Sequence, residues 1–406
     1  MEERILLRLC KMGGSELQFI QKAFEGNWVV PLGPDVDAFE KDLETFLLNG
    51  SSSSITQTPE GRIARGEKSI ECKKIAALSS GTSAIHLGLV QLGVKEGDEV
   101  MVQILTFSAS ANPVIYQGAT PVFVDSEPET WNMDPCLLEK AIEERKKKTG
   151  KLPKAIIPVH LYGMPARIDE ILEIASKWGI PVLEDAAEAF GSEYKHQACG
   201  SFGCYGALSF NGNKMITTSG GGALICPDSE AKKSVLSYAT QSREPVPWYE
   251  HEKIGFNYRM SNISAAIGRG QMLVANEHIA HHRYVQSCYR EEFRNLDGIS
   301  LHENPGPDFH SNFWLSTILI AKNRKIKGDD GCGAPEAMRR HLNERNIESR
   351  QIWKPMHMQP FFKKYDAFLN GVSADIFSRG LCLPAGPWVK EKEIERIVKA
   401  VRECLL

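Results

Sequence analysis

The chain has 406 residues, of which 42% are hydrophobic and 24% are charged, and its formal net charge is −3 at pH 7. These values are typical of a folded protein with two or three domains, and they favour neither a nucleic acid nor an anionic membrane as a partner. No apolar stretch approaches the length that spans a membrane, and the N-terminal residues carry acid where a secretion signal carries net positive charge, so we expect a cytoplasmic protein.

Two helices are predicted near the start of the chain, at residues 16–24 and 36–48, and we assign residues 1–50 to an N-terminal helical segment. Residues 51–74 form a serine-rich and then charged stretch of low complexity. Such a composition lacks the apolar side chains of a packed core, so it predicts a mobile insertion.

Strands alternate with helices between residues 75 and 256, which we assign to a large domain. The β-rich runs lie at residues 99–105, 120–125, 155–160 and 180–184, with helical patterns such as 166–178 between them. This alternation favours an α/β fold with a mostly parallel sheet that helices cover on both faces.

A turn of small residues, Ser79-Ser80-Gly81-Thr82-Ser83, separates a short apolar run from a helical pattern. The first N–H groups of a helix have no acceptor within the helix and carry partial positive charge. Gly81, Thr82 and Ser83 are therefore a candidate phosphate seat, to which Ser209 could add a hydroxyl. The signal is weak by itself, because small-residue helix starts are common and the chain has neither a G-x-x-x-x-G-K-[ST] loop nor a G-x-G-x-x-G fingerprint.

Acidic residues follow the apolar run Val182-Leu183, among them Asp185 and Glu188. Ligands dock at strand ends in an α/β sheet. If the ligand is pyridoxal phosphate, Asp185 is a candidate to pair with its pyridine nitrogen and Glu188 to reach its ring hydroxyl. Two alternatives stay open, in which Asp185 is a helix N-cap and Glu188 is the second half of a capping box.

Lys214 lies between a polar strand end at residues 209–213 and the glycine cluster at residues 220–222. An ammonium is costly to bury, so a lysine in a glycine-lined pocket can lose its proton and attack a carbonyl. An exposed loop lysine is the ordinary alternative, since lysine is rarely buried. The phosphate turn and the carboxylate of Asp185 favour a Schiff-base lysine, and the three features together fit pyridoxal phosphate.

A long helical region is predicted at residues 262–296, after a linker rich in proline and aromatic residues at 244–256. A smaller unit follows, with strands predicted at 316–321 and 349–352 and helices at 335–345 and 392–404. We assign residues 257–406 to the long helices and this small C-terminal α/β domain.

The 10 cysteines are scattered without a C-x-x-C pair, as expected of small buried side chains in a reducing compartment. Cys199 and Cys204 are close in sequence, and His278, His281 and His282 share one predicted helix. No second ligand pair completes a tetrahedral site, so we predict no bound metal.

In chain order, the phosphate turn, Asp185 and Lys214 resemble the large domain of fold-type I pyridoxal phosphate enzymes, and more narrowly the DegT-type nucleotide-sugar aminotransferases. Several separated segments are similar to the 4-aminotransferases of the bacterial UDP-N,N′-diacetylbacillosamine pathway: Trp28–Gly33, His160–Gly163, Tyr249–Asn262 and Trp353–His357. The resemblance runs from Met12 to the last predicted helix.

This resemblance implies a function for each matching residue. Lys214 would bind the cofactor as a Schiff base, Asp185 would pair with the pyridine nitrogen, and Glu188 would contact the ring oxygen. Phe107 would stack on the ring, and Asn257 would reach the cofactor phosphate of a neighbouring subunit. The last contact implies a homodimer with shared active sites.

The implied activity is amino transfer from L-glutamate to C4 of a UDP-linked 4-keto-6-deoxy-N-acetylhexosamine, yielding UDP-4-amino-4,6-dideoxy-GlcNAc for bacterial glycan or glycoprotein biosynthesis. Two alternatives stay open: a 4-aminotransferase for another nucleotide sugar, of the perosamine type, and a non-catalytic pyridoxal phosphate-binding or sensor protein.

A nucleotide sugar carries a diphosphate, so basic and polar residues near the strand ends are candidate substrate contacts. They are His160, Tyr162, Arg259, Arg350, Lys354 and His357. Each residue could instead have an ordinary structural position. Arg259 could hold a helix start, and His357 could be a histidine under the Trp353 loop whose ring nitrogens are hydrogen-bonded within the protein.

Overall fold

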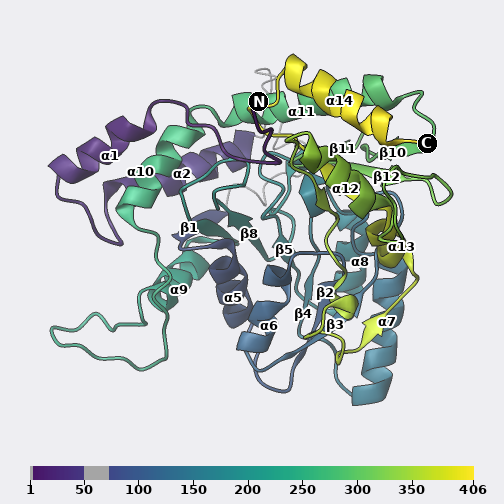
Figure 1. The fold of residues 1–406 in the computed structure, drawn as a ribbon. Helices are drawn as coiled ribbons and strands as arrows, with labels where there is room; N and C mark the ends of the chain where they lie inside the picture. Colours follow the sequence, from purple (N-terminus) through teal and green to yellow (C-terminus); the bar gives the residue numbers. More distant parts are fainter. Residues whose placement is uncertain (1–2, 50–72) are drawn as a thin grey trace.

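The computed structural model describes residues 3–49 and 73–406 (Figure 1). Helices α1 (Glu16–Glu25) and α2 (Pro34–Asn49) lie where the sequence predicts them. The predicted insertion at 51–74 falls outside the described residues, except at its end. There Lys73 is buried and donates to the Gly203 carbonyl at 2.7 Å, and Lys74 opens strand β1 (Lys74–Leu78). These two lysines therefore belong to the folded body, which corrects the predicted limit of the insertion.

The central sheet has the strand order β1-β9-β8-β5-β4-β2-β3-β14, in which isolated parallel bridges at Ile156–Val182 and Val159–Asp185 join β4 to β5. Strand β9 is antiparallel to both of its neighbours, and all pairs from β8 to β14 are parallel. The bounds are β2 Glu99–Gln103, β3 Thr120–Val124, β4 Ala155–Ile157, β5 Leu183–Asp185, β8 Tyr205–Ser209, β9 Gly222–Cys226 and β14 Ala367–Phe368. The predicted mostly parallel sheet is confirmed, with β14 as an edge strand that the sequence did not indicate.

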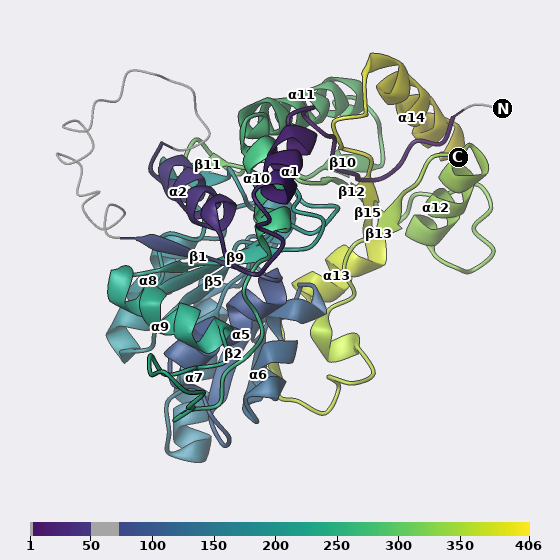
Figure 2. The same cartoon turned by 90° about the vertical axis from the view of Figure 1, so that its left-hand side faces the viewer.

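Alternate residues of the parallel strands belong to separate apolar cores on the two faces of the sheet. In β2, Val100 and Val102 pack in one core with helices α5 (Gly81–Gln91) and α6 (Asn112–Tyr116). Met101 packs in the other core, with helices α7 (Pro135–Thr149) and α8 (Ile168–Trp178). Helices therefore cover both faces, as predicted (Figures 1 and 2).

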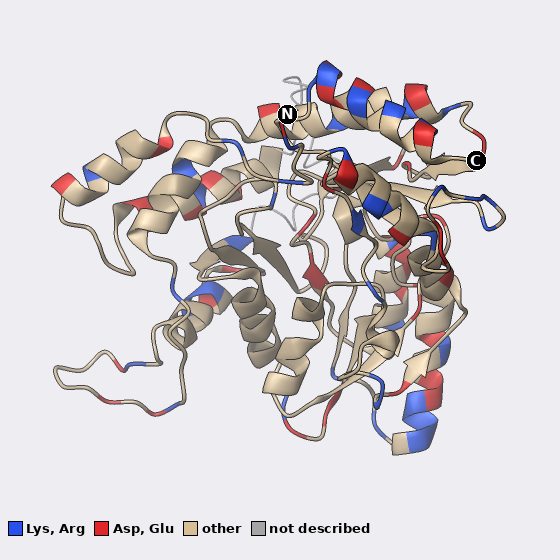
Figure 3. Cartoon of the chain, viewed as in Figure 1, with Lys and Arg blue, Asp and Glu red and all other residues tan. Residues whose placement is uncertain are grey.

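Helix α7 shows how local sequence sets the limits of a helix. The Asp134 side chain accepts the N–H of Leu137 at 3.2 Å, Pro135 takes the first helical position, and Gly150 ends the helix with a φ of 74°. The last turn carries three exposed lysines, Lys146, Lys147 and Lys148, and forms a basic tip in Figure 3. This basic run is thus a solvated face.

The C-terminal part forms a smaller antiparallel sheet in the order β10-β12-β15-β13, with its own apolar core. Its elements are α11 Ala275–Phe293, β10 Ile299–Leu301, β12 Ser316–Ile320, α12 Ala334–Glu344, β13 Arg350–Gln351, α13 Val372–Arg379, β15 Gly380–Leu383 and α14 Glu391–Cys404. The start of the chain also reaches this unit, because Ile5 lies in its core and pairs with Ile347 (Figure 2). The residues before α1 therefore help to close the C-terminal unit.

A long loop joins α9 (Ser229–Ala239) to α10 (Asn262–Met272) and projects from the body of the molecule (Figure 1). The predicted helical region at 262–296 is divided into α10 and α11, because α10 packs on α1 and α2 whereas α11 packs on α14. None of the described helices combines the length and apolar composition that crossing a bilayer requires.

Candidate active site

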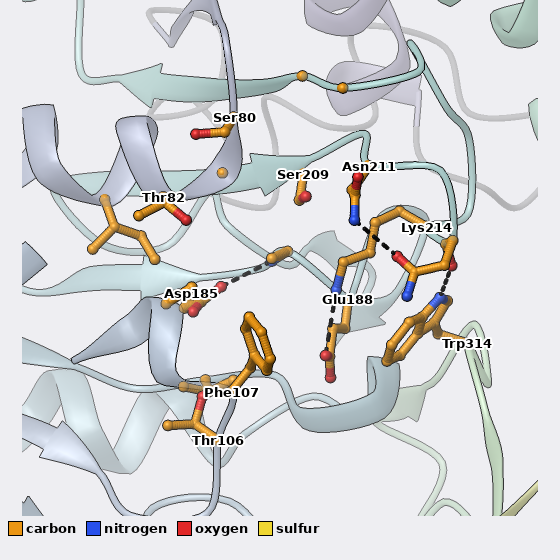
Figure 4. Close-up of a pocket in the computed structure, with 18 of the residues that line it drawn as sticks. Ser80, Thr82, Thr106, Phe107, Asp185, Glu188, Ser209, Asn211, Lys214 and Trp314 are labelled. Carbon is orange, nitrogen blue, oxygen red and sulfur yellow. Dashed lines mark hydrogen bonds and ion pairs between the residues drawn. The ribbon is translucent and has the colours of Figure 1, made fainter. Parts of the chain in front are cut away.

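A cavity of about 290 Å³ opens where the strands of the central sheet end (Figure 4). Strands β1, β5 and β8 point in the same direction, so their C-terminal ends meet at one edge of the sheet. This edge brings together the turn at residues 79–82, Asp185 and Ser209. The loop after β8 adds Lys214, so residues more than 130 positions apart share one wall.

The turn before α5 presents hydrogen-bond donors to the cavity. Ser80 is the N-cap of α5, and its Oγ accepts the N–H of Ser83 at 3.0 Å. Gly81 and Thr82 occupy the first turn, where N–H groups have no acceptor within the helix. Thr82 and Ser209 lie around this helix end in Figure 4. These groups form a seat for a dianion.

Ser83 does not line the cavity, contrary to the sequence prediction. Its hydroxyl bonds the Ser80 hydroxyl at 2.8 Å and the Ser79 hydroxyl at 3.1 Å, so it stabilises the turn from behind. Ser80 takes its place in the cavity wall. The N-cap preference for serine was the signal that could have identified Ser80.

The phosphate seat depends on a close backbone approach at Gly222, the first residue of β9. A Cβ atom at this position would overlap the Ser80 carbonyl carbon and the Gly81 nitrogen. We expect Gly222→Ala to lower the free energy of unfolding by about 3 kcal/mol, because backbone atoms of the turn would have to move. Gly220→Ala is the control, since a Cβ at Gly220 meets no atom within 4 Å, and it should change the free energy by about 0.5 kcal/mol or less. Urea unfolding of the two variants tests this, and equal losses would contradict it.

Asp185 is buried at the end of β5, and its carboxylate is held by two donors. Its Oδ2 accepts the Ser110 hydroxyl at 2.6 Å, and its Oδ1 accepts the Ala187 N–H at 3.1 Å. The Ser110 hydroxyl is linked in turn to Thr106 at 2.6 Å. A turn, and not a helix, follows Asp185, so the capping alternatives for Asp185 and Glu188 are set aside.

Lys214 and Glu188 meet in the cavity (Figure 4). The Lys214 Nζ lies 3.3 Å from Glu188 Oε1 and 4.2 Å from the centroid of the Trp314 ring. The other oxygen of Glu188, Oε2, accepts the Tyr162 N–H at 2.7 Å. Burial raises the pKa of the Glu188 carboxyl, and the positive charge of Lys214 opposes this shift.

Two aromatic residues complete the cavity. Trp314 is fixed by a hydrogen bond from its Nε1–H to the Asn213 carbonyl at 2.7 Å. Phe107 is 54% exposed, although it is large and apolar, and its ring centroid lies 5.3 Å from that of Trp353. An open aromatic face beside Asp185 can accept a planar ring.

His160 and Tyr162, two predicted substrate contacts, do not reach the cavity. His160 is completely buried, accepts the Ala166 N–H at its Nδ1 at 3.0 Å, and has its Nε2 2.8 Å from Glu184. Tyr162 is buried, and its hydroxyl accepts the Trp353 N–H at 2.8 Å. Both residues shape the wall from behind, because their polar atoms are already bound within the protein.

Arg259 is also placed elsewhere than predicted. Its guanidinium pairs with the buried carboxylate of Glu40 and donates to the Ala77 carbonyl at 2.9 Å. It therefore connects α2 to β1 and lies outside the cavity, so its position is structural, although it does not hold a helix start. Asn257 is exposed in the segment before α10 and does not line this chain's cavity either.

Arg350, Lys354 and His357 are not part of the main cavity. Arg350 is 59% exposed at its side chain, lies 3.2 Å from Glu348, and lines a small neighbouring cavity of about 90 Å³. Lys354 is exposed and His357 is half-buried, and neither lines either cavity.

Several residues of the site were not predicted from the sequence. They are Ser80, Thr106, Asn211, Asn213, Trp314 and Trp353 in the cavity wall, and Ser110 behind Asp185. Among the described residues, the group of side chains close enough to hold a metal ion is Asp329, Asp330 and Cys332, which lies on an exposed loop and includes none of the cysteines and histidines considered above.

Comparison with known proteins places this site in a family. Residues 67–402 match the DegT/DnrJ/EryC1/StrS aminotransferase family. EpsN of Bacillus subtilis, named as a pyridoxal phosphate-dependent aminotransferase, is 41% identical over 99% of this chain and 96% of its own. GDP-perosamine synthase of Escherichia coli O157:H7 is 33% identical over 96% of this chain and 95% of its own. The crystal structure of a DegT DnrJ EryC1 StrS aminotransferase from Brucella abortus superposes with a TM-score of 0.82 at 28% identity, covering 96% of this chain and 94% of that chain. The chain therefore belongs to the DegT/DnrJ/EryC1/StrS aminotransferases, enzymes of fold-type I that use pyridoxal phosphate.

Proposed function

We propose that the protein transfers the amino group of L-glutamate to C4 of a UDP-linked 4-keto-6-deoxy-N-acetylhexosamine and so forms UDP-4-amino-4,6-dideoxy-GlcNAc. The observation that carries this proposal is the contact of Lys214 with Glu188 in a cavity that Asp185 and the first turn of α5 also line. An amine, a carboxylate and a phosphate seat around one cavity are the set that pyridoxal phosphate requires.

The residues of the cavity fit the parts of this cofactor. The N–H groups of Gly81 and Thr82 and the Ser209 hydroxyl suit its phosphate, because a helix N-terminus favours an anion. The Asp185 carboxylate suits the pyridine nitrogen, and Phe107 offers a ring face. Gly222 lies too close to the backbone of Ser80 and Gly81 to carry a side chain, which agrees with a phosphate seat shaped by backbone.

When bound, pyridoxal phosphate supplies an electron sink for the charge left on the donor's α-carbon after proton loss. Asp185 keeps the ring nitrogen protonated and so maintains this sink. Lys214 would hold the cofactor through its aldehyde and, as the free amine, would carry the α-proton of the donor as general base and general acid. The same residues act in reverse order when the amino group passes to the keto sugar.

The homodimer belongs to this proposal. The loop between α9 and α10 projects from the chain and exposes Trp248, Tyr249 and Ile254, which are 60%, 80% and 86% exposed. Such side chains gain by being covered. Asn257 follows the same loop and is exposed, so it is free to complete the phosphate seat of a second copy.

A GDP-linked 4-keto-6-deoxy sugar is the second candidate acceptor. It is favoured by the 33% identity to GDP-perosamine synthase over nearly the whole chain. The UDP-linked acceptor is favoured by the segments Trp28–Gly33, His160–Gly163, Tyr249–Asn262 and Trp353–His357, which resemble those of 4-aminotransferases that act on a UDP-linked sugar.

The test is amino transfer to a panel of UDP-, GDP- and dTDP-linked 4-keto-6-deoxy sugars with L-glutamate as the donor. We expect product masses in which an amino group replaces the keto oxygen, with the highest kcat/KM for the UDP-linked N-acetyl sugar. Because the keto acid formed from glutamate must leave before the acceptor reacts, double-reciprocal plots should be parallel. A preference for the GDP-linked sugar would transfer the proposal to the second candidate, and intersecting plots would contradict the scheme.

A further inference from the structure

The ion pair of Lys214 and Glu188 lies in a nearly closed environment. The side chain of Glu188 is 5% exposed and that of Lys214 is 14% exposed, and their charged atoms are 3.3 Å apart. Among the described residues, Lys214 is the cationic side chain that contacts this carboxylate. The other titratable groups that face Glu188 are the carboxyl of Asp185, the hydroxyl of Tyr162 and the thiol of Cys382, none of which carries positive charge.

This pair cannot keep both charges throughout the reaction. When Lys214 binds the cofactor aldehyde, its amine must first lose a proton, because only the neutral amine is a nucleophile. Glu188 would then be a buried carboxylate without its cation, with a second carboxylate at Asp185 nearby. Leaving one member of a buried ion pair unpaired is strongly unfavourable. Transfer of one proton from Lys214 to Glu188 gives the neutral amine and also removes the negative charge of the carboxylate.

We propose that Glu188 is a catalytic residue that takes the ammonium proton of Lys214 when Lys214 joins the cofactor, and returns it when Lys214 is released. One N–H bond breaks and one O–H bond forms, so an ammonium and a carboxylate become an amine and a carboxylic acid. The amine then condenses with the aldehyde, and water leaves with the aldehyde oxygen. The net charge of the pair is zero before and after, so no proton has to be exchanged with solvent.

Two further contacts suit this exchange. The Tyr162 N–H, 2.7 Å from Oε2, holds one oxygen of Glu188 and leaves Oε1 toward Lys214. The Trp314 ring, 4.2 Å from Nζ, favours the ammonium form through a cation–π contact. Trp314 is held in place by Asn213, in the same loop as Lys214, so it can receive the ammonium each time the lysine is released.

The inference rests on the assignment of Lys214 as the residue that binds the cofactor. It is tested by mixing the apo-protein with pyridoxal phosphate and following formation of the yellow covalent complex at several pH values. In the wild-type protein the rate should change less than about twofold between about pH 6 and 8, because the proton moves within the pair. In Glu188→Gln, the lysine proton must go to solvent. We expect a rate about 10²-fold lower near pH 7 that rises about tenfold per pH unit.

The glutamine retains the acceptor for the Tyr162 N–H, and near-ultraviolet circular dichroism checks that the variant is folded. Glu348→Gln is the control. Glu348 is half-buried and, like Glu188, accepts a backbone N–H, from Leu7 at 3.0 Å, so this variant should keep the flat profile. Infrared difference spectroscopy provides a second measurement on the wild-type protein, in which a protonated carboxyl band should appear on cofactor addition and be absent in Glu188→Gln.

A flat profile in Glu188→Gln, or the absence of the carboxyl band in wild-type protein that turns yellow, would overturn the inference while leaving the proposed function intact. A wild-type protein that forms no covalent complex at Lys214 would overturn both.

Discussion

Replacing Lys214 with alanine should lower the rate of amino transfer by at least about 10⁴-fold, because the nucleophile and the proton carrier are lost in one side chain. The cavity would keep its phosphate seat, Asp185 and Phe107, so the variant should still bind pyridoxal phosphate, but without a covalent bond. The purified variant should therefore lack the yellow absorbance of the wild-type protein. Lys195→Ala is the control, because Lys195 pairs with Asp169 at the surface and does not line the cavity.

The bond itself can be located. Reduction of the wild-type protein with borohydride should fix the cofactor to one peptide, and mass spectrometry should find the pyridoxyl group at residue 214. A modified lysine elsewhere, or a Lys214→Ala variant that remains yellow and active, would remove the basis of the proposed function.

The parts of this site that could be predicted from the sequence are those in which neighbouring residues determine the structure. The turn before α5 is marked by its small residues and a serine cap, and Asp185 ends an apolar run that favours a buried strand. Lys214 follows the end of β8, which is parallel to β5, so it lies at the same edge of the sheet as Asp185. The mostly parallel sheet and its two covered faces follow from the same alternation of strands and helices.

The substrate residues could not be predicted in this way, because a charged side chain does not reveal its partner. Arg259 is satisfied by Glu40, which lies 219 positions earlier, and His160 by Glu184 on the neighbouring strand. Trp314 contacts Lys214 from a segment 100 residues later, where no local pattern marks it. Such contacts depend on tertiary packing, and only the packed structure reveals them.

The same limit applies to the edges of the fold. Strand β14 has two residues and pairs with β3 from the far end of the chain, so neither its length nor its composition identifies it. Arg8 donates to the Lys214 carbonyl at 2.7 Å from a segment that precedes every helix, and the sequence gives no periodic signal there. Arg8 thus holds the active-site loop and β14 extends the sheet, and local propensity predicts neither contact.

Replacing Asp185 with asparagine should lower kcat by about 10³-fold while leaving the protein yellow. The amide oxygen can keep the Ala187 N–H, now 3.1 Å from Oδ1, and the amide NH2 group can donate to the Ser110 oxygen, so the side chain should keep its position and lose its charge. Without a carboxylate beside it, the ring nitrogen is no longer kept protonated, and the electrons of the donor's α-carbon have no sink. Lys214 remains, so the covalent complex should still form.

Ser110→Ala is the matched variant, because it keeps the Asp185 charge and removes the hydroxyl that orients it. The contact between Asp185 Oδ1 and the Ala187 N–H, at 3.1 Å, remains in this variant. We therefore expect kcat to fall by about tenfold, as for a positioning residue. Steady-state rates and absorbance spectra of the two variants separate charge from position. If Ser110→Ala lowered kcat as much as Asp185→Asn, the contribution of Asp185 would be orientation and not charge. If Asp185→Asn lowered kcat by less than about tenfold, another group would have to pair with the ring nitrogen.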